Sequence, residues 1–158
     1  METKTLIDNY LDGPQLLRKA VAGMSQEQLV ARPIPRKWST LEVICHLADF
    51  EIVYADRIKR VIAENDPTLF GGDPDGFAAR LAYHQRNAEE ELLLIEAIRK
   101  QVARILRTVK LDDFQRRGIH SESGPLTLET LVQRITGHIP HHVRFIEEKR
   151  KAMAEDRR

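Results

Sequence analysis

Apolar residues recur three and four positions apart in four long blocks, and this repetition constrains the fold more than any other feature of the sequence. Short stretches rich in Gly, Pro, Asp and Ser separate the blocks. Each apolar stripe is too narrow to be enclosed on all sides, so helices that carry such stripes must pack against one another. The sequence therefore predicts an all-α fold, a four-helix bundle with mainly antiparallel neighbours.

Two capping patterns mark where helices begin. Ser39 and Glu42 form a Ser-x-x-Glu capping box, which predicts a helix over about residues 40–64. Ser25 and Gln28 repeat the pattern as Ser-x-x-Gln and predict a short helical piece.

The other three long helices follow from their apolar ladders. The first covers about residues 6–21, where Gly13-Pro14 is expected to bend or restart it. The third is expected over about residues 83–109, and the fourth after Thr127 as its cap. The residues expected to face inward on the third are Leu93, Ile95, Ile98, Val102, Ile105 and Leu106. The intervening residues 66–76 and 116–127 are expected to be loops.

The totals place the chain among single-domain helical proteins. A length of 158 residues suits one domain, 1–158, with 42% apolar and 31% charged residues and few aromatics. The net charge is only +1 and both signs are interspersed, including in the tail "EEKRKAMAEDRR", which is expected to be solvated. We therefore expect no nucleic-acid partner.

The single cysteine, Cys45, excludes an internal disulfide and a cysteine-based zinc site, and it fits a reducing compartment. The first residues lack the basic start and apolar run of a signal peptide, and no apolar segment approaches membrane-spanning length. The expected localisation is cytoplasmic, without a membrane partner.

Histidines are concentrated in the stretch "TGHIPHHVRF", residues 136–145, which holds three of the six in the chain. His138 and His142 continue the apolar ladder of the fourth helix, and His46 lies on the inward face of the second. A solvated patch, or core histidines bonded to backbone carbonyls, would be the simplest explanation. However, three buried imidazoles without partners would each cost roughly 1–3 kcal/mol, and a divalent metal held by all three removes that cost.

The sequence contains no competing metal or phosphate motif, since His-Glu-x-x-His, paired Glu-x-x-His, Cys-x-x-Cys and glycine-rich phosphate loops are all missing. Pro140 lies between the two ligands of the fourth helix, where a kink or bulge would re-aim the rings. His141 is then an alternative ligand, although His142 continues the ladder and is preferred.

Two segments together resemble the DinB-like superfamily, which includes bacillithiol transferases and mycothiol-dependent enzymes. They are "WSTLEVICHLADFE" at 38–51 and "GPLTLETLVQRITGHIPHHVRFIEE" at 124–148. The resemblance extends over nearly the whole chain, and it implies a four-helix bundle that holds a metal through His46, His138 and His142. It also implies a homodimer. Characterised members of that superfamily use the metal to activate a low-molecular-weight thiol.

Three neutral imidazoles leave a coordination position on zinc or nickel open to water or a substrate atom. The first functional hypothesis is therefore a metal-dependent thiol S-transferase that acts on a small electrophile, with the thiol as cosubstrate. The alternatives are a metal-dependent hydrolase and a non-catalytic bundle that the metal stabilises.

Five further residues near the predicted site each have two interpretations. Asp49 either accepts a ring N–H of His46 or forms a surface salt bridge, and Glu42 either orients His46 or serves only as a cap. Cys45 is expected to be a small core residue and Trp38 a hydrophobic staple. His120 either reaches the mouth of the site or is a solvated loop residue.

Overall fold

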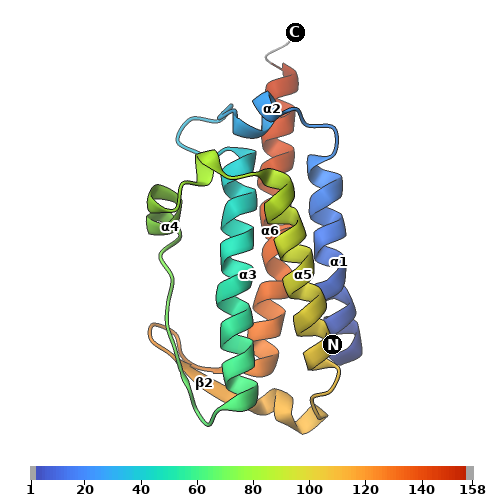
Figure 1. Ribbon diagram of the computed structural model, residues 1–158, viewed down its shortest axis with the longest axis vertical. Helices are drawn as coiled ribbons and strands as arrows, with labels where there is room; N and C mark the ends of the chain where they lie inside the picture. Colours follow the sequence, from blue (N-terminus) through green and yellow to red (C-terminus); the bar gives the residue numbers. More distant parts are fainter. Residues whose placement is uncertain (1–2, 156–158) are drawn as a thin grey trace.

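Four long helices form most of the computed structural model, which describes residues 3–155 (Figure 1). They are α1 (Thr3–Val21), α3 (Thr40–Ala63), α5 (Ala88–Leu106) and α6 (Leu128–Glu155). The shorter helices are α2 (Gln26–Val30) and α4 (Pro74–Arg80), with 3-10 turns η1 (Tyr83–Gln85) and η2 (Leu111–Gln115). The predicted four-helix bundle is confirmed. Among residues 3–155, no helix is long and apolar enough to cross a membrane.

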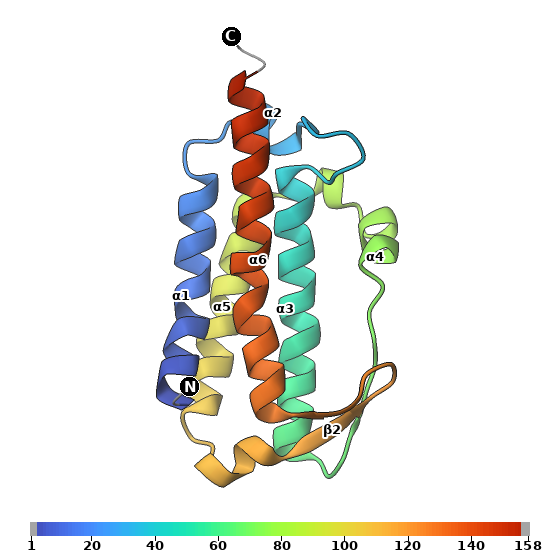
Figure 2. The same cartoon turned by 180° about the vertical axis from the view of Figure 1, so that it is seen from behind.

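The directions of the helices differ from the expected antiparallel arrangement. In Figure 1, and seen from behind in Figure 2, α1 and α6 run upward while α3 and α5 run downward. Helices α1 and α6 pack against each other, as do α3 and α5, so the bundle contains two parallel pairs. The reason is the long connection over residues 64–87, which returns to the start of α3 before α5 begins.

A small sheet replaces two of the predicted loops. Strand β1 (Thr68–Leu69) pairs in parallel with β2 (Arg117–His120), which pairs antiparallel with β3 (Gly124–Thr127). The hairpin of β2 and β3 therefore ties the α3–α5 connection to the segment that leads into α6. Strands of two and four residues are too short to produce a readable alternation of apolar and polar residues.

The predicted helix starts are confirmed at three places. Ser39 and Glu42 form the reciprocal capping box at the start of α3, with bonds of 3.1 and 2.7 Å. Ser25 does the same at α2, and Thr127 Oγ1 accepts the N–H of Thr130 at 3.1 Å. The third long helix begins later than expected, because Asn87 caps it after the η1 turn.

Helix α1 continues through Pro14 because a side chain from another helix replaces the missing hydrogen bond. Pro14 has no N–H, so the carbonyl of Tyr10 lacks its helical donor. Arg99 Nη1 from α5 donates to that carbonyl at 2.6 Å. Gly13 makes the approach possible, since a Cβ there would lie 2.1 Å from Arg99 Nη1.

Arg99 also binds two other helices from inside the bundle. Its Nε donates to Glu51 of α3 at 2.8 Å, and its Nη2 donates to the Ile135 carbonyl of α6 at 2.9 Å. Glu51 additionally accepts the hydroxyl of Tyr10 at 3.2 Å. Both charged side chains are completely buried, so this network joins all four long helices.

The structure corrects the prediction of which residues on α5 face the core. Leu93 is 52% exposed, so its predicted inward position is wrong. The buried positions are instead Leu92, Ile95, Arg99, Val102, Ala103 and Leu106, with Glu91 at the start of the helix. Three consecutive leucines at 92–94 obscured the register, because Arg99 is a charged member of the buried stripe.

Candidate metal centre

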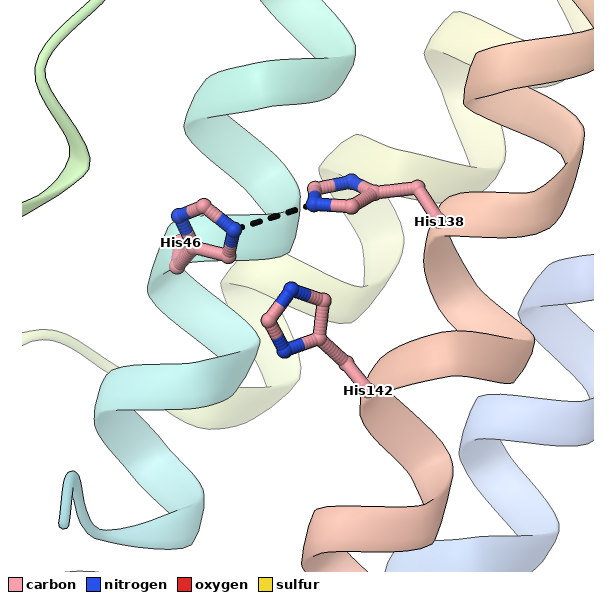
Figure 3. Close-up of side chains that lie close together, drawn as sticks. All are labelled: His46, His138 and His142. Atoms are coloured by element: carbon pink, nitrogen blue, oxygen red, sulfur yellow. Dashed lines mark hydrogen bonds between the residues drawn. The ribbon is translucent and has the colours of Figure 1, made fainter.

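Three histidine rings converge between α3 and α6 (Figure 3). His138 and His142 are one turn apart on α6, and the packing of α3 against α6 brings His46 opposite them. The Nε2 atoms of His46 and His138 are 3.0 Å apart. The ring centroid of His142 lies 4.7 Å from that of His46 and 4.8 Å from that of His138. One nitrogen from each ring lies within 4.8 Å of the other two.

Burial keeps all three rings neutral near pH 7. It lowers the pKa of His46 to about 4, although the charges of Asp49 and Asp75 act in the opposite direction. Burial and the neighbouring histidines lower the pKa of His138 to about 2 and that of His142 to about 3. Neutral imidazole is the form that binds a metal, so no deprotonation is needed before binding.

The hydrogen-bonding state of the rings fits a divalent ion. The Nδ1 atoms of all three are buried and have no hydrogen-bond partner among the described residues. Each neutral ring has one donor nitrogen and one acceptor nitrogen. Hydrogen bonding among the three nitrogens that face one another therefore cannot pair all of them. A cation at the point of convergence satisfies three lone pairs at once, and three imidazoles are a donor set that zinc and nickel accept.

His142 rather than His141 belongs to this cluster. Helix α6 is continuous through Pro140, and His141 is exposed with its Nδ1 2.9 Å from Arg144 Nη2. Both Pro140 and His141 lie on the outer side of the helix, so the proline does not exchange the two neighbouring histidines.

The two carboxylates nearest to His46 in sequence have other partners. Asp49 accepts two hydrogen bonds from Arg86, at 3.0 and 2.9 Å, so it forms a salt bridge as one interpretation expected, although the pair is largely buried and not at the surface. Glu42 caps α3 and forms an ion pair with Arg32. Burial of the Glu42 carboxyl is outweighed by these donors, which lower its pKa.

Cys45 and His120 both have structural roles, because each forms hydrogen bonds within the protein. The thiol of Cys45 is buried and donates to the Tyr83 carbonyl at 3.5 Å, and burial raises its pKa to about 12. The expectation of a core residue, not a nucleophile, agrees with this. His120 is a buried residue of β2, and its Nδ1 accepts the backbone N–H groups of Glu122 and Ser123 at 3.2 Å. It closes the hairpin turn and is not a solvated loop residue.

A cavity of about 250 Å³ adjoins the cluster, and His142 lies in its wall. Ile34, Trp38, Val43 and Phe145 form the apolar part of the lining. The Trp38 ring also lies 5.2 Å from the His46 ring, centroid to centroid. Trp38, which was expected to be a hydrophobic staple, therefore also contributes to the wall of a cavity, a role that the sequence did not indicate.

The fold and the cluster together define a four-helix bundle with three histidines that can hold a metal. The sequence profile of the DinB superfamily matches residues 10–146. The chain belongs to the DinB superfamily.

Relatives of this chain carry names that refer to metal-dependent chemistry. A protein of Oceanobacillus iheyensis named "Putative metal-dependent hydrolase" is 31% identical over 140 residues, which cover 89% of this chain and 81% of the relative. A Bacillus cereus protein of the same name is 24% identical over 155 residues, covering 96% and 89%.

A solved structure supports the fold. YfiT from Bacillus subtilis, described as "a probable metal-dependent hydrolase with an unusual four-helix bundle topology", superposes with a TM-score of 0.90 at 23% identity. The match covers 97% of this chain and 88% of that one.

Proposed function

We propose that this protein is a metal-dependent thiol S-transferase that acts on a small electrophile. His46, His138 and His142 would hold one divalent ion, zinc or nickel. The observation that carries the proposal is the convergence of three neutral histidine nitrogens beside a cavity large enough for a small molecule. A purely stabilising ion would not need such a cavity, which argues against a non-catalytic bundle.

When bound, a divalent ion of this kind acts as a Lewis acid that lowers the pKa of a thiol or a water molecule. Residues of the protein provide the environment that such an ion needs. The three imidazoles are held neutral by burial, as their lowered pKa values indicate. The rings of Trp38 and Phe50, 5.2 and 4.7 Å from His46, keep water away from one side.

The carboxylates around the cluster favour a thiol over water as the nucleophile. Asp49 and Glu42, the acids closest to His46 in sequence, already form ion pairs with Arg86 and Arg32, so neither carboxylate is free to serve as the base. Water must lose a proton to attack, and enzymes usually supply a base for it. A thiol has an unperturbed pKa of about 8.5 and needs only a modest shift to ionise at neutral pH.

Hydrolysis is the second candidate, and one residue favours it besides the names of the relatives. Asp75 is an exposed carboxylate in the wall of the cavity, and its charge acts on His46. In this alternative Asp75 would accept the proton from water.

The two reactions can be separated with zinc- or nickel-loaded protein. One arm combines cysteine with 1-chloro-2,4-dinitrobenzene, and the other supplies 4-nitrophenyl acetate without a thiol. We expect metal-dependent formation of the S-aryl product, identified by its mass, and little change in that rate in Asp75→Asn. Ester hydrolysis that requires both metal and Asp75, without any thiol adduct, would instead establish the hydrolase.

A further inference from the structure

A buried lysine faces the same cavity. Lys149 of α6 is only 3% exposed, and its ammonium group donates to the Phe145 carbonyl of its own helix at 3.1 Å. That carbonyl is the normal acceptor of a helical N–H, so this bond is shared. The ammonium group has three donors, and Lys149 lines the cavity.

Nearby acids do not neutralise this charge at close range. Among residues 3–155, no carboxylate oxygen lies within 4.0 Å of the Lys149 nitrogen. Glu42 and Glu148 act on it only from a greater distance. Glu42 is already bound by Arg32 and the Ser39 N–H, and Glu148 is exposed. Burial accordingly lowers the pKa of Lys149. A buried ammonium group without a close counter-ion is costly, and an anionic ligand removes that cost.

The rest of the lining sets the charge and shape of such a ligand. Arg36 and Lys37 add two exposed cations, while Asp75 and Glu148 add two exposed carboxylates, so with Lys149 the formal sum is three positive and two negative charges. One net positive charge suits a single negative charge better than a phosphate dianion. The apolar surface of Trp38, Val43 and Phe145 suits a hydrocarbon body.

We propose that this cavity binds a small amphipathic carboxylic acid, whose carboxylate pairs with Lys149 and whose apolar body packs against Trp38 and Phe145. The end of the molecule beside His142 is then the reacting end. That last statement rests on the proposed function, whereas the binding of the carboxylate does not. The substrate class is thus a monocarboxylate with an apolar chain.

Trp38 allows the binding to be measured directly, because it is the only tryptophan of the chain and lies in the cavity wall. The full-length protein is titrated with hexanoate, hexanamide and hexyl phosphate while the tryptophan emission is followed. Each titration is done on zinc-loaded protein and again after chelation, so that binding to the ion is separated from binding to Lys149. We expect hexanoate to bind in both states, with hexanamide and hexyl phosphate at least about tenfold weaker.

Variants on one helix provide the matched control. Lys149→Met should weaken hexanoate binding by about tenfold or more and leave hexanamide unchanged, while Lys151→Met, on the exposed face of α6, should bind as the wild type does. Lys149→Arg retains the charge and should retain most of the preference for hexanoate over hexanamide.

Three results would overturn the proposal: equal binding of hexanoate and hexanamide, tighter binding of hexyl phosphate, or no saturable change with hexanoate. If Lys149→Met does not fold, the ligand comparison on the wild type and on Lys149→Arg still decides. Because the chelated protein is included, a negative thiol-transfer assay together with selective hexanoate binding would reject the proposed reaction and keep the carboxylate site.

Discussion

Two groups of buried polar side chains lie in the same bundle, and they differ in whether the protein itself satisfies them. In the network of Arg99, Glu51 and Tyr10, donors from α1 and α5 meet carboxylate and carbonyl acceptors from α1, α3 and α6. In the cluster of His46, His138 and His142, the Nδ1 atoms have no partner among the described residues, and ring nitrogens face one another. The first group is complete as folded, whereas in the second the nitrogens that face one another would be satisfied by the proposed divalent ion.

The two groups are also coupled electrostatically. The positive charge of Arg99 is one of the causes that lower the pKa of His138, after burial and the neighbouring histidines. The acids near the cluster are themselves held by arginines, as in the pair of Asp49 and Arg86. The complete network therefore helps to maintain the neutral rings that metal binding requires.

Removing Arg99 should produce the largest change in stability. Arg99→Met leaves Glu51 as an uncompensated buried charge and removes the donors to Tyr10 and Ile135, so we expect a loss of about 3–5 kcal/mol in the free energy of unfolding. Urea denaturation of the metal-free protein measures it. Arg104→Met, on the exposed face of α5, is the control and should change stability by less than about 0.5 kcal/mol. A similarly small effect in Arg99→Met would show that the network is not structural.

Removing a histidine should affect metal binding instead. His46→Ala should lower zinc affinity by more than about 100-fold, the upper end for residues that only orient ligands. The metal-free stability should fall far less than in Arg99→Met, because the ring has no Nδ1 partner to lose. Metal analysis after dialysis gives the occupancy, with His84→Ala, an exposed histidine, as the control. Full metal content in His46→Ala would exclude this set of ligands.

Acid should weaken the metal-free protein through the cluster before it reaches the carboxylates. The pKa values of His46, His138 and His142 are lowered to about 4, 2 and 3, whereas an unfolded histidine titrates near ~6.5. Between these values the unfolded chain binds more protons, so the free energy of unfolding falls as pH falls. The slope is up to about 1.4 kcal/mol per pH unit for each histidine. Above about pH 7 both states are neutral and the effect vanishes.

Unfolding measured at intervals from pH 7.5 to 4.5 tests this prediction. A variant with all three histidines changed to glutamine should show a much smaller slope in that window. His120, whose pKa burial also lowers, remains in both proteins and cancels from the comparison. Equal slopes in the two proteins would contradict the assignment of neutral rings.

The histidine cluster was accessible to sequence reasoning because its geometry is local. One helical turn separates His138 from His142, and a single inward position on the second helix supplies His46. The helix starts were accessible for the same reason, since a capping box lies within four residues. The parallel helix pairs were not, because the path of residues 64–87 depends on pairing between β1 and β2, which are distant in sequence.

The buried positions of Lys149 and Arg99 could not be predicted from the sequence, where both look like ordinary surface charges. Lys149 belongs to a tail that was expected to be solvated, but it is buried and lines a cavity together with Arg36, Lys37 and Trp38 from a distant segment. In the sequence Arg99 looks like a surface charge, yet its acceptors are the Tyr10 carbonyl of α1, the Glu51 carboxylate of α3 and the Ile135 carbonyl of α6. Long-range packing determines where both side chains lie, so no local sequence pattern indicates their positions.

The smallest predicted effect separates the members of the complete network. Tyr10→Phe removes one hydrogen bond to Glu51, at 3.2 Å, while both bonds from Arg99 to that carboxylate remain. Glu51 therefore keeps its counter-ion, and we expect a loss of about 0.5–1.5 kcal/mol, well below that of Arg99→Met. Urea denaturation gives the difference, and zinc content should be unchanged because the hydroxyl does not contact the histidines. A loss as large as that of Arg99→Met would mean that Tyr10, and not the arginine, is what makes burial of the Glu51 charge possible. The double variant, with a loss smaller than the sum of the two single losses, would place both residues in one coupled network.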